Sequence, residues 1–225
     1  MENIKNCLIY KILREFKNLF VSFVDIIKCY LTRTAMVIKD HYWDKRLGIK
    51  TTAPFHFYND PDLDKHITQY VPTPYDRLKQ IMDYLNLQTS DVFIDLGCGQ
   101  GRTIFFAAQQ RLKKVIGIEI NKELADIAKD NCKNLKTNNA PVEIINIDVT
   151  LFDPKDGNIF FMFNPFGAQT LLTVIENIKK SLLSYPRKIR IVYFGPEHRF
   201  VLDIQNWLFL ETDINNGEVL VWRNK

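Results

Sequence analysis

Three glycines at alternate positions directly follow a short apolar stretch, and this cluster constrains the sequence more than any other feature. Residues 91–96 read Asp-Val-Phe-Ile-Asp-Leu, the glycines are Gly97, Gly99 and Gly101, and a helical pattern follows at 103–110. A turn without Cβ atoms lets a ligand approach the backbone, and the N-terminus of the next helix directs N–H groups towards that ligand. The cluster therefore predicts an anion or nucleotide site at the end of a buried parallel strand.

The spacing of these glycines is not that of a dinucleotide site. Such a site has the pattern G-x-G-x-x-G, whereas here the third glycine comes one residue early and Arg102 stands where the last glycine belongs. The acidic residue Asp95 at the strand end, followed by G-x-G-x-G, resembles motif I of the class I S-adenosylmethionine-dependent methyltransferases. We expect residues 70–225 to form the methyltransferase-like domain and residues 1–69 to form a helical extension with an aromatic-rich connector.

Apolar stretches and helical patterns alternate along the rest of the chain. This alternation predicts parallel strands joined by right-handed helical crossovers. The last two stretches flank Asn215-Asn216-Gly217, a turn sequence typical of an antiparallel hairpin. The expected fold is α/β, a Rossmann-like seven-stranded, mostly parallel sheet with a C-terminal antiparallel hairpin, which is also the fold that the resemblance implies. Strands are expected at 91–96, 114–119, 142–147, 158–163, 188–194, 207–214 and 218–222, and helices at 76–85, 101–111, 121–136 and 169–183.

Acidic residues close the two strands that follow the glycine cluster. Glu119 lies 24 positions after Asp95, where a carboxylate can accept both hydroxyls of a ribose. Asp148 closes the next strand, and in the resembled family an acidic residue there faces the adenine amino group. The alternative is a doubly wound sheet in which these carboxylates only cap helices.

The resemblance implies S-adenosyl-L-methionine as the cofactor. Backbone N–H groups of the glycine loop would meet its methionine part, Glu119 would hold the ribose, and Asp148 with the backbone of Val149 would read the adenine. The residues expected to bind the cofactor are Tyr70, Pro72, Thr73, Asp95, Gly97, Cys98, Gly99, Gly101, Arg102, Glu119, Ile120, Asp148, Val149 and Asn164.

A proline-containing segment, Tyr-Val-Pro-Thr-Pro at residues 70–74, precedes the helix expected at 76–85. The two prolines hold the backbone extended, and Thr73 or Asp76 could cap the helix. The segment resembles the Tyr-x-Pro-Thr-Pro sequence of some class I protein lysine methyltransferases, in which it folds over the methionine end of the cofactor. A helix start alone would explain the prolines and the threonine, but it leaves Tyr70 without a role.

The sequence Asn164-Pro165-Phe166-Gly167 closes the strand expected at 158–163 and is the candidate acceptor site. It resembles the Asn-Pro-Pro-Tyr motif of methyltransferases that modify exocyclic or amide nitrogens. Asn164, Pro165 and Phe166 are therefore the expected catalytic residues. Phe166 replaces the second proline of that motif, and Gly167 replaces its aromatic residue. The alternative is a β-turn that opens the next helix, with Asn164 bonding its own backbone.

Charge is unevenly distributed along the chain. The 225 residues carry a net charge of +4, but residues 1–50 hold ten Lys or Arg against five Asp or Glu. The remainder is near neutral, which argues against a broad nucleic-acid-binding surface there. Residues 3–38 show apolar positions at intervals of three and four, which predicts an amphipathic helix. Packing on the body, pairing with a second copy, and contact with a membrane surface or a protein partner remain open for this helix.

Other features disfavour membrane-spanning, secreted and metal-binding classes. The apolar run at 19–27 contains Asp25 and is shorter than the about 20 residues of a membrane span, and no small-residue cleavage site follows it. The four cysteines and four histidines show no pairing or ligand spacing, which favours a reducing, cytoplasmic compartment and no metal. Residues 39–69 are expected to be irregular, either covering the active site or packing on the sheet.

Three functions compete at this point. The first is a methyltransferase acting on nitrogen of a protein side chain or a small molecule. Residues 70–74 favour a protein lysine, while Asn164-Pro165 favours an amide or base amino group. The second is a non-catalytic, cofactor-binding subunit that recruits a protein or membrane partner through residues 3–38. The third is a nicotinamide oxidoreductase, which Arg102 disfavours.

Overall fold

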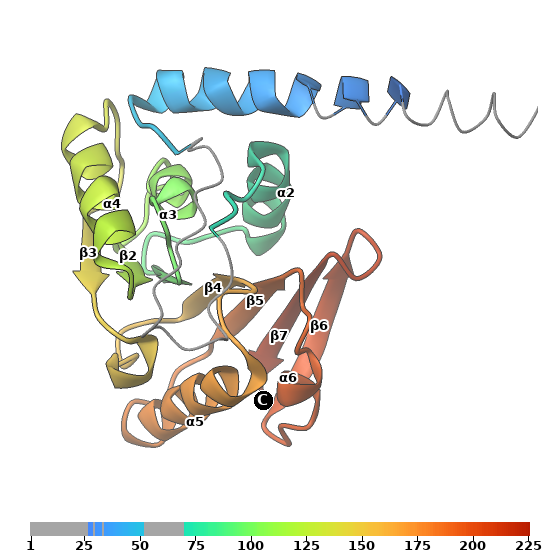
Figure 1. Cartoon of the computed structure of the whole chain (residues 1–225). Coiled ribbons are helices and arrows are strands. Elements are labelled where there is room, and N and C mark those ends of the chain that lie inside the picture. The colour runs from blue at the N-terminus through green and yellow to red at the C-terminus, as the bar shows by residue number, and fades with distance from the viewer. Residues whose placement is uncertain (1–26, 29, 33, 52–69) are drawn as a thin grey trace, which may run out of the picture. The chain divides into compact units, whose positions relative to one another are not determined.

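The computed structural model describes residues 27–28, 30–32, 34–51 and 70–225 (Figure 1). The chain divides into two compact units between Tyr42 and Trp43. Most of the amphipathic helix expected at residues 3–38 lies outside the described residues. Residues 34–47 are helical, so the expectation that the chain is irregular from residue 39 is wrong as far as residue 47.

The second unit is built on a seven-stranded sheet in the order β3-β2-β1-β4-β5-β7-β6. The first five strands of that order pair in parallel, and β7 pairs antiparallel with both β5 and β6. This confirms the predicted α/β class, the mostly parallel sheet and the closing hairpin. The strands are β1 (Val92–Leu96), β2 (Lys114–Glu119), β3 (Val142–Asn146), β4 (Ile159–Phe163), β5 (Arg190–Phe194), β6 (Leu208–Ile214) and β7 (Val219–Asn224).

Helices cover both faces of the sheet: α2, α3 and α4 lie on one face, and α5 and α6 lie on the other (Figure 1). The helix after the glycines is shorter than the predicted 101–111, and the short helices η1 and α6 were not predicted. The helices are α2 (Tyr75–Leu85), α3 (Arg102–Ala107), α4 (Lys122–Asn134), η1 (Val149–Leu151), α5 (Ala168–Ser184) and α6 (Phe200–Asp203).

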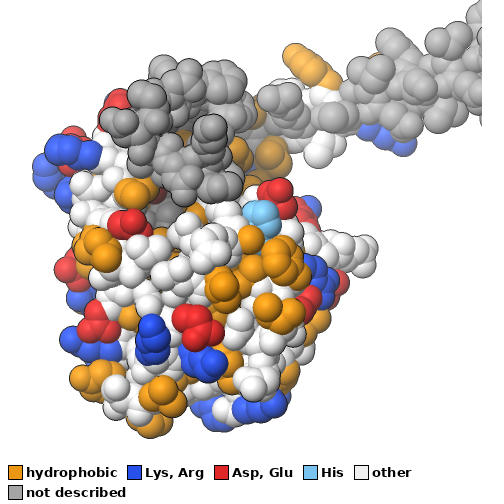
Figure 2. Space-filling model, turned by 60° about the horizontal axis from the view of Figure 1, so that its bottom comes forward, with side chains coloured by type: hydrophobic (Ala, Val, Ile, Leu, Met, Phe, Trp, Pro, Cys, Tyr) orange, Lys and Arg blue, Asp and Glu red, His pale blue; other side chains and the backbone are white. Residues whose placement is uncertain are grey.

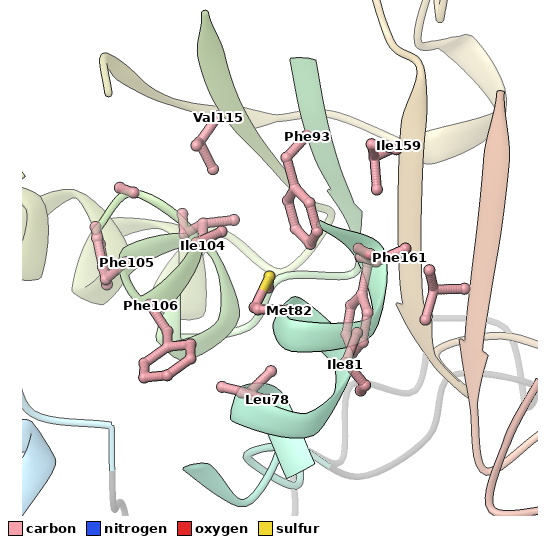
Figure 3. Packing of buried hydrophobic residues seen from close by; sticks show 14 of the residues in the cluster. Leu78, Ile81, Met82, Phe93, Ile104, Phe105, Phe106, Val115, Ile159 and Phe161 are labelled. Atoms are coloured by element: carbon pink, nitrogen blue, oxygen red, sulfur yellow. The ribbon is translucent and has the colours of Figure 1, made fainter. Parts of the chain in front are cut away.

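Successive side chains of the central strands enter two separate cores. Phe93 and Phe161, on neighbouring strands, stack with ring centroids 6.2 Å apart and face α2 and α3 (Figure 3). Ile94 and Phe160 point to the opposite face and pack with the apolar side of α5. All five residues of β1 are buried, as expected for a parallel strand that is covered on both sides.

The sheet has one topological switch point, between β1 and β4. From β1 the chain continues to β2 and β3 on one side, whereas β4 lies on the other side of β1 and continues to β5. The loops that leave the carboxyl ends of β1 and β4 therefore diverge, and ligands of open α/β sheets bind in the crevice between such loops. The glycine cluster follows β1, and Asn164 follows β4.

Residues 43–51 belong to the second unit, although the sequence placed the domain start at residue 70. Trp43 stacks on Tyr75 at 5.7 Å, and Leu47 and Ile49 are buried in the core. Gly48 ends the helix in the left-handed region (φ 82°), where a glycine carries no Cβ penalty. These contacts make residues 43–51 part of the structure that surrounds the glycine loop.

Among the described residues, no helix has both the length and the apolar character needed to cross a bilayer. On the face shown in Figure 2, basic, acidic and hydrophobic side chains are interspersed over the described surface. The described residues of that face form no continuous basic patch of the kind that binds a nucleic-acid backbone.

Candidate active site

The glycine loop is compact because its backbone turns repeatedly through conformations that favour glycine. Gly97, Gly99 and Gly101 have φ values of 89°, 53° and 92°. The N–H groups of Gly97 and Cys98 both donate to the carbonyl of Ile118, at 2.9 Å each. A Cβ at the first glycine would collide with Pro165, and one at the second would collide with the Tyr70 ring. The loop is thus held between β2 and two other segments that the sequence assigned to the site.

Glu119 fixes the two loops that border the crevice. Its Oε2 accepts the N–H of Gly99 at 2.8 Å, and its Oε1 accepts the N–H of Asn121 at 2.9 Å. Burial raises the pKa of this carboxyl, although the backbone N–H bonds oppose that shift. Each carboxylate oxygen can accept more than one hydrogen bond, so these contacts leave Glu119 able to accept the hydroxyls of a ribose.

Asp95 is buried close to Glu119. Its exposed fraction is 2%, and burial together with the charge of Glu119 holds its pKa well above the usual range, against a hydrogen bond from Thr103. Two nearby buried carboxylates disfavour each other's ionisation, and a cation placed beside them relieves that cost. The site is therefore electrostatically suited to a positively charged ligand.

Tyr70 lies against the glycine loop, and its hydroxyl donates to the carbonyl of Thr51 at 3.1 Å. Burial raises the pKa of its phenol, which keeps it protonated.

Thr73 is buried with its hydroxyl 3.5 Å from that of Thr103, whereas Pro72 is half-buried. Neither Thr73 nor Asp76 caps α2: the N-cap is Pro74, whose carbonyl accepts the first helical N–H groups. The extended prolines thus leave Thr73 facing α3.

Arg102 bonds to segments that precede the glycine loop in the sequence. Its Nε donates to Thr51 Oγ1 at 2.7 Å, and one terminal nitrogen donates to the Thr73 carbonyl at 3.3 Å. The guanidinium also lies 4.8 Å over the Tyr75 ring and 3.9 Å from Asp44 Oδ1. These contacts tie α3 to both segments, so they give Arg102 a structural role, and its contact with the cofactor stays a prediction.

Asp44 completes this buried arrangement. Its carboxylate accepts the backbone N–H of Thr51 at 2.6 Å, the hydroxyl of the same residue at 2.8 Å, and the Tyr75 hydroxyl at 2.6 Å. Burial and the neighbouring Asp44 charge raise the pKa of Tyr75. Asp44 could not be found from the sequence, because an isolated aspartate on a helix carries no spacing signal for a partner 58 positions away (Arg102).

The expected adenine end of the crevice lies beyond β2 and β3. The Asp148 carboxylate accepts the N–H and the hydroxyl of Thr150, both at 2.8 Å, and so caps η1. Ile120, directly after Glu119, is 40% exposed, as expected of an apolar side chain that a ring could cover. Val149 is half-buried against the core. The capping role suggested as an alternative for Asp148 is present, and its contact with adenine stays a prediction.

Asn164 and Pro165 border the other side of the crevice. Asn164 adopts a positive φ of 39°; Tyr193 donates its hydroxyl to Asn164 Oδ1 at 2.7 Å, and Asn164 Nδ2 donates to Glu197 Oε2 at 2.8 Å. Burial, with a smaller effect of the Glu197 charge, raises the pKa of Tyr193, which keeps the phenol a donor.

Phe166 is 8% exposed and packs in the core on the α5 side of the sheet. The structure therefore does not bring its ring to the crevice.

Cys98 is also buried, with its Sγ against Gly117, which places it beneath the loop. In the part of the chain that the structure describes, no group of three or more His, Cys, Asp or Glu side chains could hold a metal ion.

Parts of the chain are similar in sequence to known methyltransferases. Residues 67–148 match the family model described as histone methylation protein DOT1. A stretch of 107 residues is 35% identical to the histone-lysine N-methyltransferase, H3 lysine-79 specific, of Dictyostelium discoideum and covers 42% of this chain and 6% of that protein. A stretch of 67 residues is 40% identical to a protein-lysine N-methyltransferase of Saccharolobus islandicus and covers 27% of this chain and 42% of that protein.

The fold has relatives among solved structures. The human methyltransferase 10 domain containing protein superposes with a TM-score of 0.53 at 14% identity, over 85% of this chain and 95% of that one. The motif, the sheet and the sequence matches support a class I S-adenosylmethionine-dependent methyltransferase. The matched stretches span less than half the length of the two lysine methyltransferases named above.

Proposed function

We propose that this protein transfers the methyl group of S-adenosylmethionine to the side-chain nitrogen of lysine in a protein. The observation that carries the proposal is the position of Tyr70, whose ring lies directly on Gly99 of the glycine loop. Tyr70 opens the segment that resembles the Tyr-x-Pro-Thr-Pro sequence of some class I protein lysine methyltransferases, and the family match at residues 67–148 includes that segment.

The surroundings of Asn164 also favour an alkylamine over a planar acceptor. Methyltransferases with an Asn-Pro-Pro-Tyr motif stack the target on the aromatic residue of the motif. Here Gly167 occupies that position and Phe166 is buried in the core, so neither residue supplies a stacking ring. A lysine side chain needs no such ring, because it can enter as a narrow aliphatic stem.

When bound, the cofactor supplies an electrophilic methyl group on a sulfonium. The protein has to align the two reactants and exclude water, which accounts for a large part of the rate enhancement in such displacements. Glu119 would orient the ribose, Ile120 would cover the adenine, and Tyr70 would close the methionine end over Gly99. Asp95, whose ionisation a cation favours, would offset the positive charge of the ligand.

The acceptor enters as an ammonium ion and must first lose a proton to water. Its nitrogen lone pair then forms the new N–C bond, while the S–C bond breaks with its electron pair remaining on sulfur. The products are a methylated ammonium, which can lose its extra proton to water, and neutral S-adenosylhomocysteine. Burial of the Tyr70 and Tyr75 phenols, whose pKa values are raised, keeps both protonated and makes neither a base for this step.

The proposal is tested by incubating the full chain with methyl-labelled cofactor, a total protein extract and a mixture of small amines. We expect the label on lysine residues of one or a few proteins, located by mass spectrometry of peptides. Label found only on small molecules or on other side chains would contradict it. Binding of S-adenosylhomocysteine without any transfer would favour the non-catalytic subunit instead.

A further inference from the structure

Three side chains from different elements meet at the carboxyl edge of the sheet beside the glycine loop. Asn164 follows β4, Tyr193 lies on β5, and Glu197 follows the turn after β5. The Tyr193 hydroxyl donates to Asn164 Oδ1 at 2.7 Å, and Asn164 Nδ2 donates to Glu197 Oε2 at 2.8 Å. No sequence motif connects Glu197 to the other two residues.

This group borders the crevice at the topological switch point. Pro165, next to Asn164, packs on Gly97 so closely that a Cβ there would collide with it. Gly195, which ends β5 with a φ of 59°, lies beside Phe163 and Asn164. Because the carboxyl ends of β1, β4 and β5 share this edge, Glu197 lies on the side of the crevice opposite β2 and Glu119.

The bonds determine the orientation of the Asn164 amide. A carboxylate can only accept hydrogen bonds, so the amide atom that faces Glu197 must be the nitrogen, and the oxygen must face Tyr193. The residue also holds a positive φ of 39°, which is uncommon outside glycine and persists where the surroundings fix it. Asn164 is therefore a rigid support that holds the Glu197 carboxylate in one place.

The charge of Glu197 is available to a ligand. Its side chain is exposed, and its hydrogen-bond donor, the Asn164 amide, is neutral. Arg199, two residues on, forms its ion pair with Asp203 at 2.8 Å. Among the residues that the structure describes, no Lys or Arg forms an ion pair with Glu197.

We propose that Glu197 is the anion that seats the ammonium group of the acceptor, with Asn164 as the residue that positions it. The inference rests on the proposed lysine N-methylation and assigns the acceptor side of the same site. An exposed carboxylate that is held in place attracts a cationic side chain and raises its local concentration before the proton is lost. A neutral acceptor would not be attracted by the charge of Glu197.

The test uses the full chain, labelled cofactor and a pool of synthetic peptides that each carry one lysine. Glu197→Gln keeps the shape and removes the charge, and we expect the KM for peptides to rise roughly fivefold with little change in kcat, as loss of an exposed ion pair would give. Increasing salt should raise the KM of the wild type more than that of the variant. Affinity for S-adenosylhomocysteine should be unchanged, which shows that the variant is folded.

Two further variants sharpen the result. Glu197→Asp retains the charge and should recover part of the lost affinity for peptides. Glu176→Gln, on α5, removes another partly exposed carboxylate, which lies 3.8 Å from Lys179, and should leave the KM unchanged. If the wild type methylates lysine and Glu197→Gln does so with the same KM, the acceptor subsite is wrong while the proposed function stands. If the wild type methylates only acceptors without an amine, both are wrong.

Discussion

Asp95, which we expect to favour a cationic ligand, should lower the stability of the ligand-free protein. It is buried beside Glu119, and its pKa is held well above that of an exposed aspartate. Between the unfolded and folded pKa values, the folded state binds more protons than the unfolded state. The free energy of unfolding therefore falls as pH rises through that window, and the carboxylate destabilises the ligand-free fold at neutral pH.

Asp95→Asn should consequently stabilise the ligand-free protein at pH 7 and weaken cofactor binding. Because the fold disfavours ionisation of this carboxyl, its replacement by a neutral amide removes that cost, and a higher free energy of unfolding is expected. The gain should vanish below about pH 4, where the aspartate is protonated in both states. Thermal unfolding of both proteins across this pH range checks the prediction, and an equal or lower melting temperature of the variant at pH 7 would contradict it.

Gly99→Ala should lower cofactor affinity by tenfold or more. The added methyl group would meet the Tyr70 ring, and the φ of 53° is unfavourable for alanine. The N–H of the same residue donates to Glu119, so a shift of the loop would also disturb the ribose site. Titration with S-adenosylhomocysteine measures the effect. Gly217→Ala in the hairpin is a matched control, because that glycine also has a positive φ and an added Cβ there meets no atom within 4 Å.

At the scale of elements, residues 43–51 act as a brace for the glycine loop. Asn131 on α4 accepts the N–H of Lys50 at 2.9 Å and donates to the carbonyls of Lys50 and Gln100, both at 3.0 Å. Arg102 joins the same stretch to the start of α3 through Thr51. The brace is thus tied to the C-terminal side of the glycine loop, at Gln100 through Asn131 and at Arg102 through Thr51.

Asp44→Asn should destabilise the protein by about 2–4 kcal/mol, because it removes a buried carboxylate that lies 3.9 Å from the Arg102 guanidinium. Cofactor affinity should also fall, since Tyr70 loses the fixed position of the Thr51 carbonyl that its hydroxyl contacts. Denaturant unfolding and titration with S-adenosylhomocysteine measure the two effects. A variant as stable as the wild type would show that the buried pair does not support the loop. Lys79→Ala removes an exposed pair on α2 and should change stability by under about 1 kcal/mol.

At the scale of the whole molecule, the sheet was predictable because each of its strands is locally encoded. Strands buried on both faces read as apolar runs, and the turn residues Asn215 and Asn216 indeed adopt positive φ values of 59° and 54°. The helix as far as Leu47 was missed because aromatic residues and lysines obscure its period. The short helix α6 was missed because four residues carry too little pattern.

The site was predictable where a motif fixes the backbone and unpredictable where side chains meet over long sequence separations. Gly97, Glu119 and Asn164 lie at one edge of the sheet because each stands at the carboxyl end of one of three adjacent strands. Arg102 contacts Thr51 across a sequence separation of 51 positions, and Asn164 contacts Glu197 across a separation of 33 positions. Such pairs depend on how helices and turns pack after the sheet forms, and a single sequence does not encode them locally.

We infer that an adenosyl sulfonium binds between the glycine loop and Glu119 at the carboxyl edge of the sheet. Calorimetric titration of S-adenosylmethionine and S-adenosylhomocysteine into the wild type and Glu119→Ala tests this binding site. We expect one binding site per chain in the wild type and at least a tenfold loss of affinity in the variant, because the ribose and the N–H groups of Gly99 and Asn121 lose their acceptor. No binding heat in the wild type, or equal affinity in a folded variant, would contradict it.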